Sequence, residues 1–171
     1  KEKYNENLFF TMFSLYKVIC MNENITLAFQ NIQKKQAVIE LKGCNELTIK
    51  YGLTLSDEDI NELVEYRFKA LKDTGRIEFS EGVMKKIVED FCDSPYIMQQ
   101  NYKDTLMELQ DCFYYFKGEA MEQIADDELI TFMKIHFNEE CQGSLEYLSE
   151  TNLEELCRNT RYGFRGRYTD I

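Results

Sequence analysis

The chain has 171 residues, of which 44% are hydrophobic and 13% aromatic, so it can bury a core and wholesale disorder is excluded. A single proline and eight glycines are too few for the many turns of an all-β fold. The net charge of −11 disfavours binding of nucleic acid or an acidic membrane by the body of the chain.

The first twenty residues contain most of an apolar stretch, Leu8–Met21, that Lys17 interrupts. The stretch is too short to span a bilayer, and no small-residue cleavage site of the kind that ends a signal peptide follows it. We therefore expect residues 1–20 to be an appended apolar segment, either an extra helix or an upstream extension of the reading frame. We expect no association with a membrane.

Helical periodicity begins at Met21. The apolar residues that share the expected face of this first helix are Ile25, Phe29, Ile32, Ile39 and Leu47. The next helix starts at Ser56, because Asp59 three residues later completes a capping box, and Asp73-Thr74-Gly75 ends it. Its expected core residues are Ile60, Leu63, Val64, Phe68 and Leu71.

Further helices follow in the second half of the chain. A helix ending before Pro95 has a core face that comprises Val83, Met84, Ile87, Val88 and Phe91. Residues 102–117 hold the most regular pattern, with Tyr102, Leu106, Leu109, Phe113 and Phe116 spaced as on one helix face. We expect Asp126 to cap another helix, and Thr151 with Glu154 to form a second capping box.

These patterns predict an all-α fold: a compact, single-domain multi-helix bundle of six to eight helices. At most one short extended segment is expected near residues 76–79, where Ile77 and Phe79 alternate with charged residues. We divide the chain into the N-terminal segment 1–20, a helical domain 21–157 and a C-terminal tail 158–171.

The six cysteines have irregular spacing and form no CxxC pair. In a chain of this size they indicate reduced core thiols and a cytoplasmic protein. His136 is the only histidine, and Cys141 is its one nearby thiol, whereas zinc sites show paired close spacings. We therefore expect no metal and no cofactor, and a hydrogen-bonded core or interface role for His136.

One loop is the best candidate for a small-molecule pocket. It contains Cys92, Asp93, Ser94 and Tyr96, and His136 is a candidate to line the same pocket. A reactive Cys92 thiolate is disfavoured, because a helix C-terminus and Asp93 both present negative charge there. The sequence offers no catalytic residue, so an enzyme is an alternative without a motif to support it.

Two regions are candidates for an interaction surface. Residues 113–116 are all aromatic, and only two of them can face one core stripe, so either the helix is buried on several sides or Tyr114 and Tyr115 are exposed to a partner. The tail between Arg158 and Tyr168 holds four arginines and no acid. Its candidate interaction residues are Arg161, Tyr162, Phe164, Arg165, Arg167 and Tyr168.

The tail has three interpretations. Arginines interleaved with aromatic residues can stack on bases and pair with phosphates. They can also lie across the acidic surface of their own chain or of a partner, or carry no fixed structure. The acidic body makes nucleic-acid binding the weaker alternative.

Several strings resemble one uncharacterised bacterial family, a domain of unknown function, over about residues 21–161. The strings are Tyr51–Leu55, Arg76–Phe79, Phe91–Ile97, Thr105–Gln110, Phe113–Lys117, Asp127–Ile130 and Cys141–Leu148. The resemblance implies a bacterial, intracellular setting and transfers no activity.

We expect a non-enzymatic interaction or accessory module with a protein partner. The first alternative is a nucleic-acid-linked regulator, which binds through the tail or uses its acidic body as a nucleic-acid mimic. The second is a ligand-binding bundle or enzyme with a pocket near Cys92–Tyr96. The oligomeric state is not encoded in any pattern that we identify.

Overall fold

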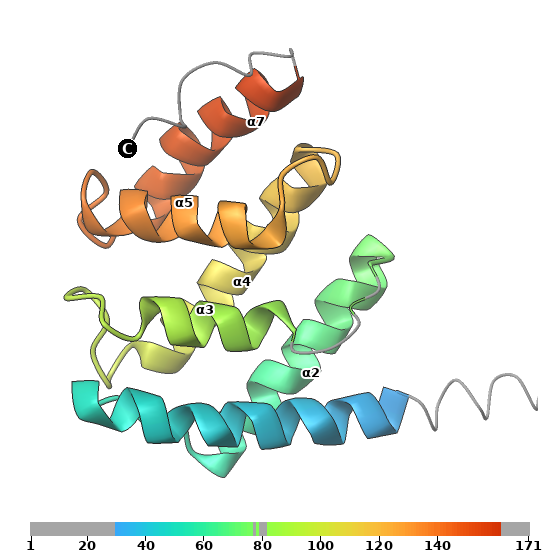
Figure 1. The fold of residues 1–171 in the computed structure, drawn as a ribbon, viewed down its shortest axis with the longest axis vertical. Coiled ribbons are helices and arrows are strands. Elements are labelled where there is room, and N and C mark those ends of the chain that lie inside the picture. Colours follow the sequence, from blue (N-terminus) through green and yellow to red (C-terminus); the bar gives the residue numbers. More distant parts are fainter. Residues whose placement is uncertain (1–29, 77, 79–81, 162–171) are drawn as a thin grey trace, which may run out of the picture. The chain divides into compact units, whose positions relative to one another are not determined.

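The computed structural model describes residues 30–76, 78 and 82–161. The chain divides into two units, Lys1–Gln36 and Ala37–Ile171, and the sites described below all lie in the second. Residues 30–48 are helical. The later elements are η1 (Ile49–Tyr51), α2 (Asp57–Thr74), α3 (Val83–Phe91), α4 (Tyr102–Glu119), α5 (Asp126–Asn138), α6 (Leu145–Tyr147), the π-helix η2 (Leu148–Leu153) and α7 (Glu154–Arg161) (Figure 1).

No strand occurs in the described residues, and the helices pack on one another, so the predicted all-α multi-helix fold is confirmed. Arg76 and Glu78 of the expected extended segment lie outside any regular element, while residues 77 and 79 are outside the described part. The expected domain boundary after residue 20 is also outside it and stays a prediction. The first residues of the predicted tail, Arg158 to Arg161, form the end of α7.

Helix α4 is at the centre of the second unit and contacts α2, α3, α5 and α7. The apolar face that the sequence predicts for this helix is confirmed, since Leu106, Leu109 and Phe113 are completely buried. Gln110, Tyr114 and Lys117 are buried as well, so α4 has a second, partly polar face that packs inside the protein. Few positions of α4 therefore remain exposed near its C-terminal end.

Helix α2 begins as the sequence predicts. The Ser56 hydroxyl accepts the Asp59 backbone N–H at 3.1 Å, and the Asp59 carboxylate accepts the Ser56 backbone N–H at 3.0 Å. This reciprocal capping box satisfies two donors at the helix start. Gly75 ends the helix in the left-handed conformation, with φ of 67°, which glycine adopts without a steric penalty.

The face predicted for residues 30–48 is wrong in the second unit. Ile39 and Leu47 are exposed, whereas Ala37, Leu41, Cys44 and Thr48 are buried. Three of these four buried side chains, Ala37, Cys44 and Thr48, are small. The Thr48 hydroxyl donates to the Leu53 carbonyl at 2.9 Å, so this helix also fixes the turn that leads to α2.

Candidate interaction site

A surface cavity of about 530 Å³ lies between the C-terminal half of α4 and the segment formed by η2 and α7. Its size is in the usual range for ligand-binding clefts. The lining residues are Tyr115, Phe116, Glu119, Glu150, Thr151, Glu154, Glu155, Arg158 and Arg161. The cavity thus combines an aromatic wall from α4 with a charged wall from η2 and α7.

The aromatic wall depends on two neighbouring residues with different roles. Phe116 is buried and belongs to the core face of α4, whereas the Tyr115 side chain is 63% exposed. Their rings meet edge to face, with centroids 4.9 Å apart. The buried Phe116 therefore supports an exposed Tyr115 ring, which is a stable surface for stacking or for a cation.

The charged wall is mainly acidic. Four glutamates line the cavity against two arginines. Arg161 Nη2 lies 3.0 Å from Glu119 Oε2, so an arginine of α7 is paired with a glutamate of α4 at one end of the cavity. Glu150, Glu154 and Glu155 are exposed, and no other described residue forms an ion pair with them. The cavity therefore has carboxylates available to a cationic ligand.

The π-helix η2 brings Glu150 and Thr151 to the cavity. The Thr151 hydroxyl donates to the Tyr147 carbonyl at 2.5 Å and to Asn152 Oδ1 at 2.9 Å. The predicted capping box at Thr151 and Glu154 is wrong, because the helical backbone continues through both residues from Leu145 to Arg161. π-helical segments inside α-helices are rare, and those that occur are frequently found at functional sites.

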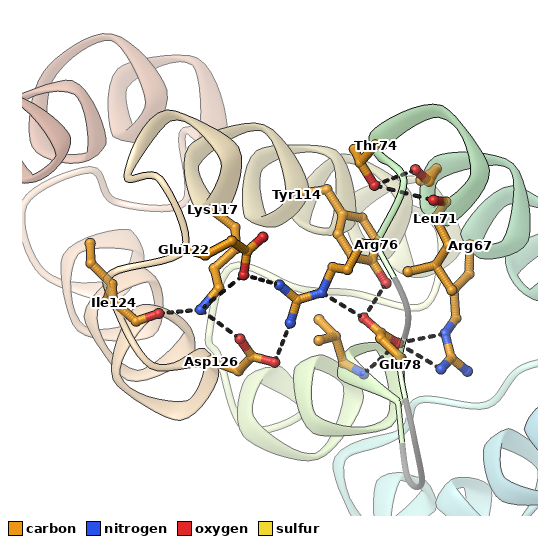
Figure 2. A network of polar contacts seen from close by, with 12 residues as sticks. Arg67, Leu71, Thr74, Arg76, Glu78, Tyr114, Lys117, Glu122, Ile124 and Asp126 are labelled. Atoms are coloured by element: carbon orange, nitrogen blue, oxygen red, sulfur yellow. Dashed lines mark hydrogen bonds and ion pairs between the residues drawn. The ribbon is translucent and has the colours of Figure 1, made fainter.

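A second polar cluster surrounds the Glu78 side chain, which binds residues of α2 and α4 (Figure 2). The Glu78 carboxylate accepts from Arg67 Nε at 3.0 Å, from Arg67 Nη2 at 2.6 Å and from the Tyr114 hydroxyl at 2.8 Å. The side chains of Arg67 and Glu78 are only 8% and 6% exposed. Burial raises the pKa of Tyr114, and the negative charge of Glu78 adds to this effect, so the hydroxyl remains a donor.

Arg76 extends this cluster to α5. It binds Glu122 and Asp126, each at 2.5 Å, and its Nε lies 3.5 Å from Glu78 Oε1. The buried Lys117 ammonium lies 2.8 Å from Asp126 and donates to the Ile124 carbonyl. Positive and negative groups balance in this cluster, so we assign it to structure. No sequence pattern predicted this cluster, although the Arg76–Phe79 string contains two of its members.

The candidate loop at Cys92–Tyr96 is used in packing. Ser94 Oγ donates to Asn138 Oδ1 at 2.6 Å, and the Tyr96 ring packs edge to face on Phe137. A β-carbon at Gly143 would lie 2.5 Å from the Tyr96 Cβ, so Tyr96 fills the space over that glycine.

The charges around this loop do not activate its thiol. Burial and the Asp93 carboxylate raise the pKa of Cys92, which disfavours a reactive thiolate. Asp93 itself is paired with Lys134 at 2.9 Å. The pocket near Cys92–Tyr96 therefore stays a prediction, and the contacts of the loop do not support it.

His136 belongs to a different cluster. Its Nδ1 lies 3.0 Å from Glu140 Oε2 and 3.0 Å from Asn152 Nδ2, and the Cys141 thiol donates to Asn152 Oδ1 at 3.3 Å. The cluster joins the end of α5 to η2. Within the described residues, no group of three or more histidine, cysteine or acidic side chains could hold a metal ion.

The structure brings together two of the interaction residues predicted from sequence. Tyr115 and Arg161 both line the cavity, although they belong to different helices. Tyr114 is buried and its hydroxyl is bound to Glu78, so it is not available to a partner. The other predicted interaction residues, Tyr162, Phe164, Arg165, Arg167 and Tyr168, lie outside the described residues.

The fold and the cavity define an all-α protein with an acidic, aromatic-walled surface cleft. In the described part of the chain, no helix combines the length and the apolar character that crossing a bilayer requires. The chain belongs to the DUF6323 family, a family of unknown function, whose model matches residues 40–166. No curated protein and no solved structure matches the chain.

Proposed function

We propose that this chain is a non-enzymatic protein-interaction module that binds an arginine-containing segment of a partner protein in the cavity between α4 and α7. The observation that carries the proposal is the arrangement of Glu150, Glu154 and Glu155, exposed and without ion-pair partners among the described residues, opposite the Tyr115 ring. A guanidinium group pairs with carboxylates and also stacks on an aromatic face.

The ion pair between Arg161 and Glu119 supports this choice of ligand, because it is an example of the same contact in the same cavity. The acidic lining also repels phosphate groups, which argues against nucleic acid as the ligand of the cavity. A cytoplasmic, bacterial setting is part of the proposal. The cysteines of the described chain, Cys44, Cys92, Cys112, Cys141 and Cys157, are all free thiols, as is usual in a reducing compartment.

The test is fluorescence anisotropy with a fluorescein-labelled oligoarginine peptide and the full chain. The E150K/E154K variant reverses two cavity charges, and E46K/E108K makes the same change in net charge at exposed residues outside the cavity. We expect E150K/E154K to weaken binding by about tenfold relative to the control variant, since two exposed ion pairs are removed and replaced by repulsion. Equal loss of affinity in both variants would overturn the proposal.

A further inference from the structure

The first two arginines of the predicted tail are at the edge of the described chain and lie at the cavity. Arg158 and Arg161 lie in the last turns of α7 and both line the cavity. Arg161 spans the cleft to Glu119 of α4. The next residues of the sequence continue directly from this cavity-lining position, so no linker separates them from the carboxylates of the charged wall.

The sequence that follows Arg161 carries positive charges that can pair with the glutamates of the cavity. Residues 162–168 supply two further arginines, Arg165 and Arg167, and three aromatic residues, with no acid among them. The charged wall offers Glu154 and Glu150, which have no ion-pair partner in the described chain. The number and sign of the charges are therefore complementary.

The spacing is complementary as well. Because a helix rises by about 1.5 Å per residue, Glu154 and Glu150 lie roughly 10 Å and 17 Å back along the helix from Arg161. An extended chain advances about 3.3 Å per residue, so after a reversal at Gly163 the backbone carries Arg165 and Arg167 roughly 7 Å and 13 Å back, and the long arginine side chains extend further. The chain must reverse direction to do this. Gly163 lies at the right place, because glycine adopts the backbone conformations that a tight reversal needs.

We infer that the cavity binds the chain's own C-terminal segment, residues 162–168, with Arg165 and Arg167 directed to Glu154 and Glu150. This inference rests on the proposed function, because the segment occupies the same site as the arginine-containing partner and competes with it. A tethered ligand has a high effective concentration, in the millimolar range for a short linker. A partner therefore has to displace the segment, and the cavity is self-blocked when no partner is present.

The experiment uses the full chain and two readouts. The first is binding of the labelled oligoarginine peptide to wild type, R165E/R167E and K69E/K72E. The last variant makes the same charge change at exposed α2 residues. The second readout is hydrogen–deuterium exchange of the amides of residues 162–168 in wild type and in E150K/E154K.

We expect R165E/R167E to bind the peptide about tenfold more tightly than K69E/K72E, because the competing segment is removed. We also expect exchange in residues 162–168 to be faster in E150K/E154K than in wild type. Equal peptide affinity of R165E/R167E and K69E/K72E, with exchange unchanged, would overturn the inference and leave the proposed function standing. Absence of peptide binding in every variant would overturn the proposed function, and the exchange readout would then decide the inference alone.

Discussion

Arg67 of α2 and Gly82, the residue before α3, leave no space between them: a β-carbon at position 82 would overlap the Arg67 guanidinium group. That guanidinium group is held by two hydrogen bonds to Glu78. Arg67 therefore cannot move aside without breaking a buried ion pair. Position 82 requires glycine because there is no space for a β-carbon.

Gly82→Ala is expected to lower the free energy of unfolding by about 1–3 kcal/mol, the usual cost of overpacking a buried position. Urea denaturation followed by circular dichroism measures it. Gly43→Ala is the matched control, since nothing lies within 4 Å of its β-carbon and its backbone is helical. The control should be neutral or stabilising by up to about 1 kcal/mol. Equal effects of the two substitutions would contradict this account of Gly82.

Tyr114→Phe tests the contact between α4 and Glu78. The substitution removes the hydroxyl that donates to the buried carboxylate at 2.8 Å, and hydrogen bonds to charged groups contribute about 1.5–3 kcal/mol. We expect a loss of that order in the free energy of unfolding. Tyr115→Phe, on the neighbouring exposed side chain, should change it by less than about 0.5 kcal/mol. A neutral Tyr114→Phe would show that the network does not depend on this hydroxyl.

The lowered pKa of Asp126 predicts that the free energy of unfolding decreases at acid pH. Burial alone would raise the pKa of Asp126, but hydrogen bonds from Lys117 and Arg76, together with their charges, lower it below its usual value. A carboxylate with a lowered pKa in the folded state stabilises the fold above its unfolded pKa, near 3.9. This stability is lost as the pH falls from about 5 through the folded pKa.

The measurement is the urea midpoint between pH 7 and pH 2. Asp126→Asn should be less stable than wild type at pH 7 and should show a flatter decline below about pH 5. Asp127→Asn, which removes only an exposed partner of Lys86, should keep the wild-type decline. If the urea midpoint of Asp126→Asn declines with pH in parallel with that of the wild type, the prediction is wrong.

The raised pKa of Cys157 predicts that the free energy of unfolding also decreases at alkaline pH. Burial raises the pKa of this thiol to about 11 from an ordinary value of 9.0. The folded state therefore holds the proton more tightly than the unfolded state, and stability that is complete below about pH 9 is lost between pH 9 and pH 11. Thermal unfolding of Cys157→Ala between pH 7 and pH 11 should show a flatter alkaline decline than wild type, although the variant is less stable at pH 7. Identical slopes in the two proteins would exclude this assignment.

The helices that the sequence predicts best are those with one regular apolar face. The periodicity of α4 and the capping box at Ser56 are local patterns, and the structure has both. The pattern at Asp126 is displaced by one residue, because Ala125 is the N-cap and Asp126 is the first residue of α5. The face of residues 37–48 was not predictable in this way, since the small residues that pack inside carry a weaker hydrophobic signal than Ile39 and Leu47.

The candidate site was only partly predictable. The surplus of aromatic residues at the end of α4 left two alternatives, burial on several sides or exposed tyrosines. In the structure Tyr114 is buried and Tyr115 is exposed. The acidic wall opposite to it depends on the contact between α4 and α7, and no local spacing encodes that contact. The buried charges of Arg67, Glu78 and Lys117 were missed because hydrophobic patterns assign charged residues to the surface. Some of their partners are as far as 36 residues away in the sequence.

The network around Arg76 and Glu78 also has a consequence for synthesis of the chain on the ribosome. Three groups that Arg76 and Glu78 bind follow them in the sequence by 36 to 50 residues, at Tyr114, Glu122 and Asp126. A nascent chain that ends before Tyr102 contains α2 and α3 but none of these later partners. These contacts of Arg76 and Glu78 can therefore form only after α4 and the start of α5 have been synthesised, which makes completion of the network a late event in folding.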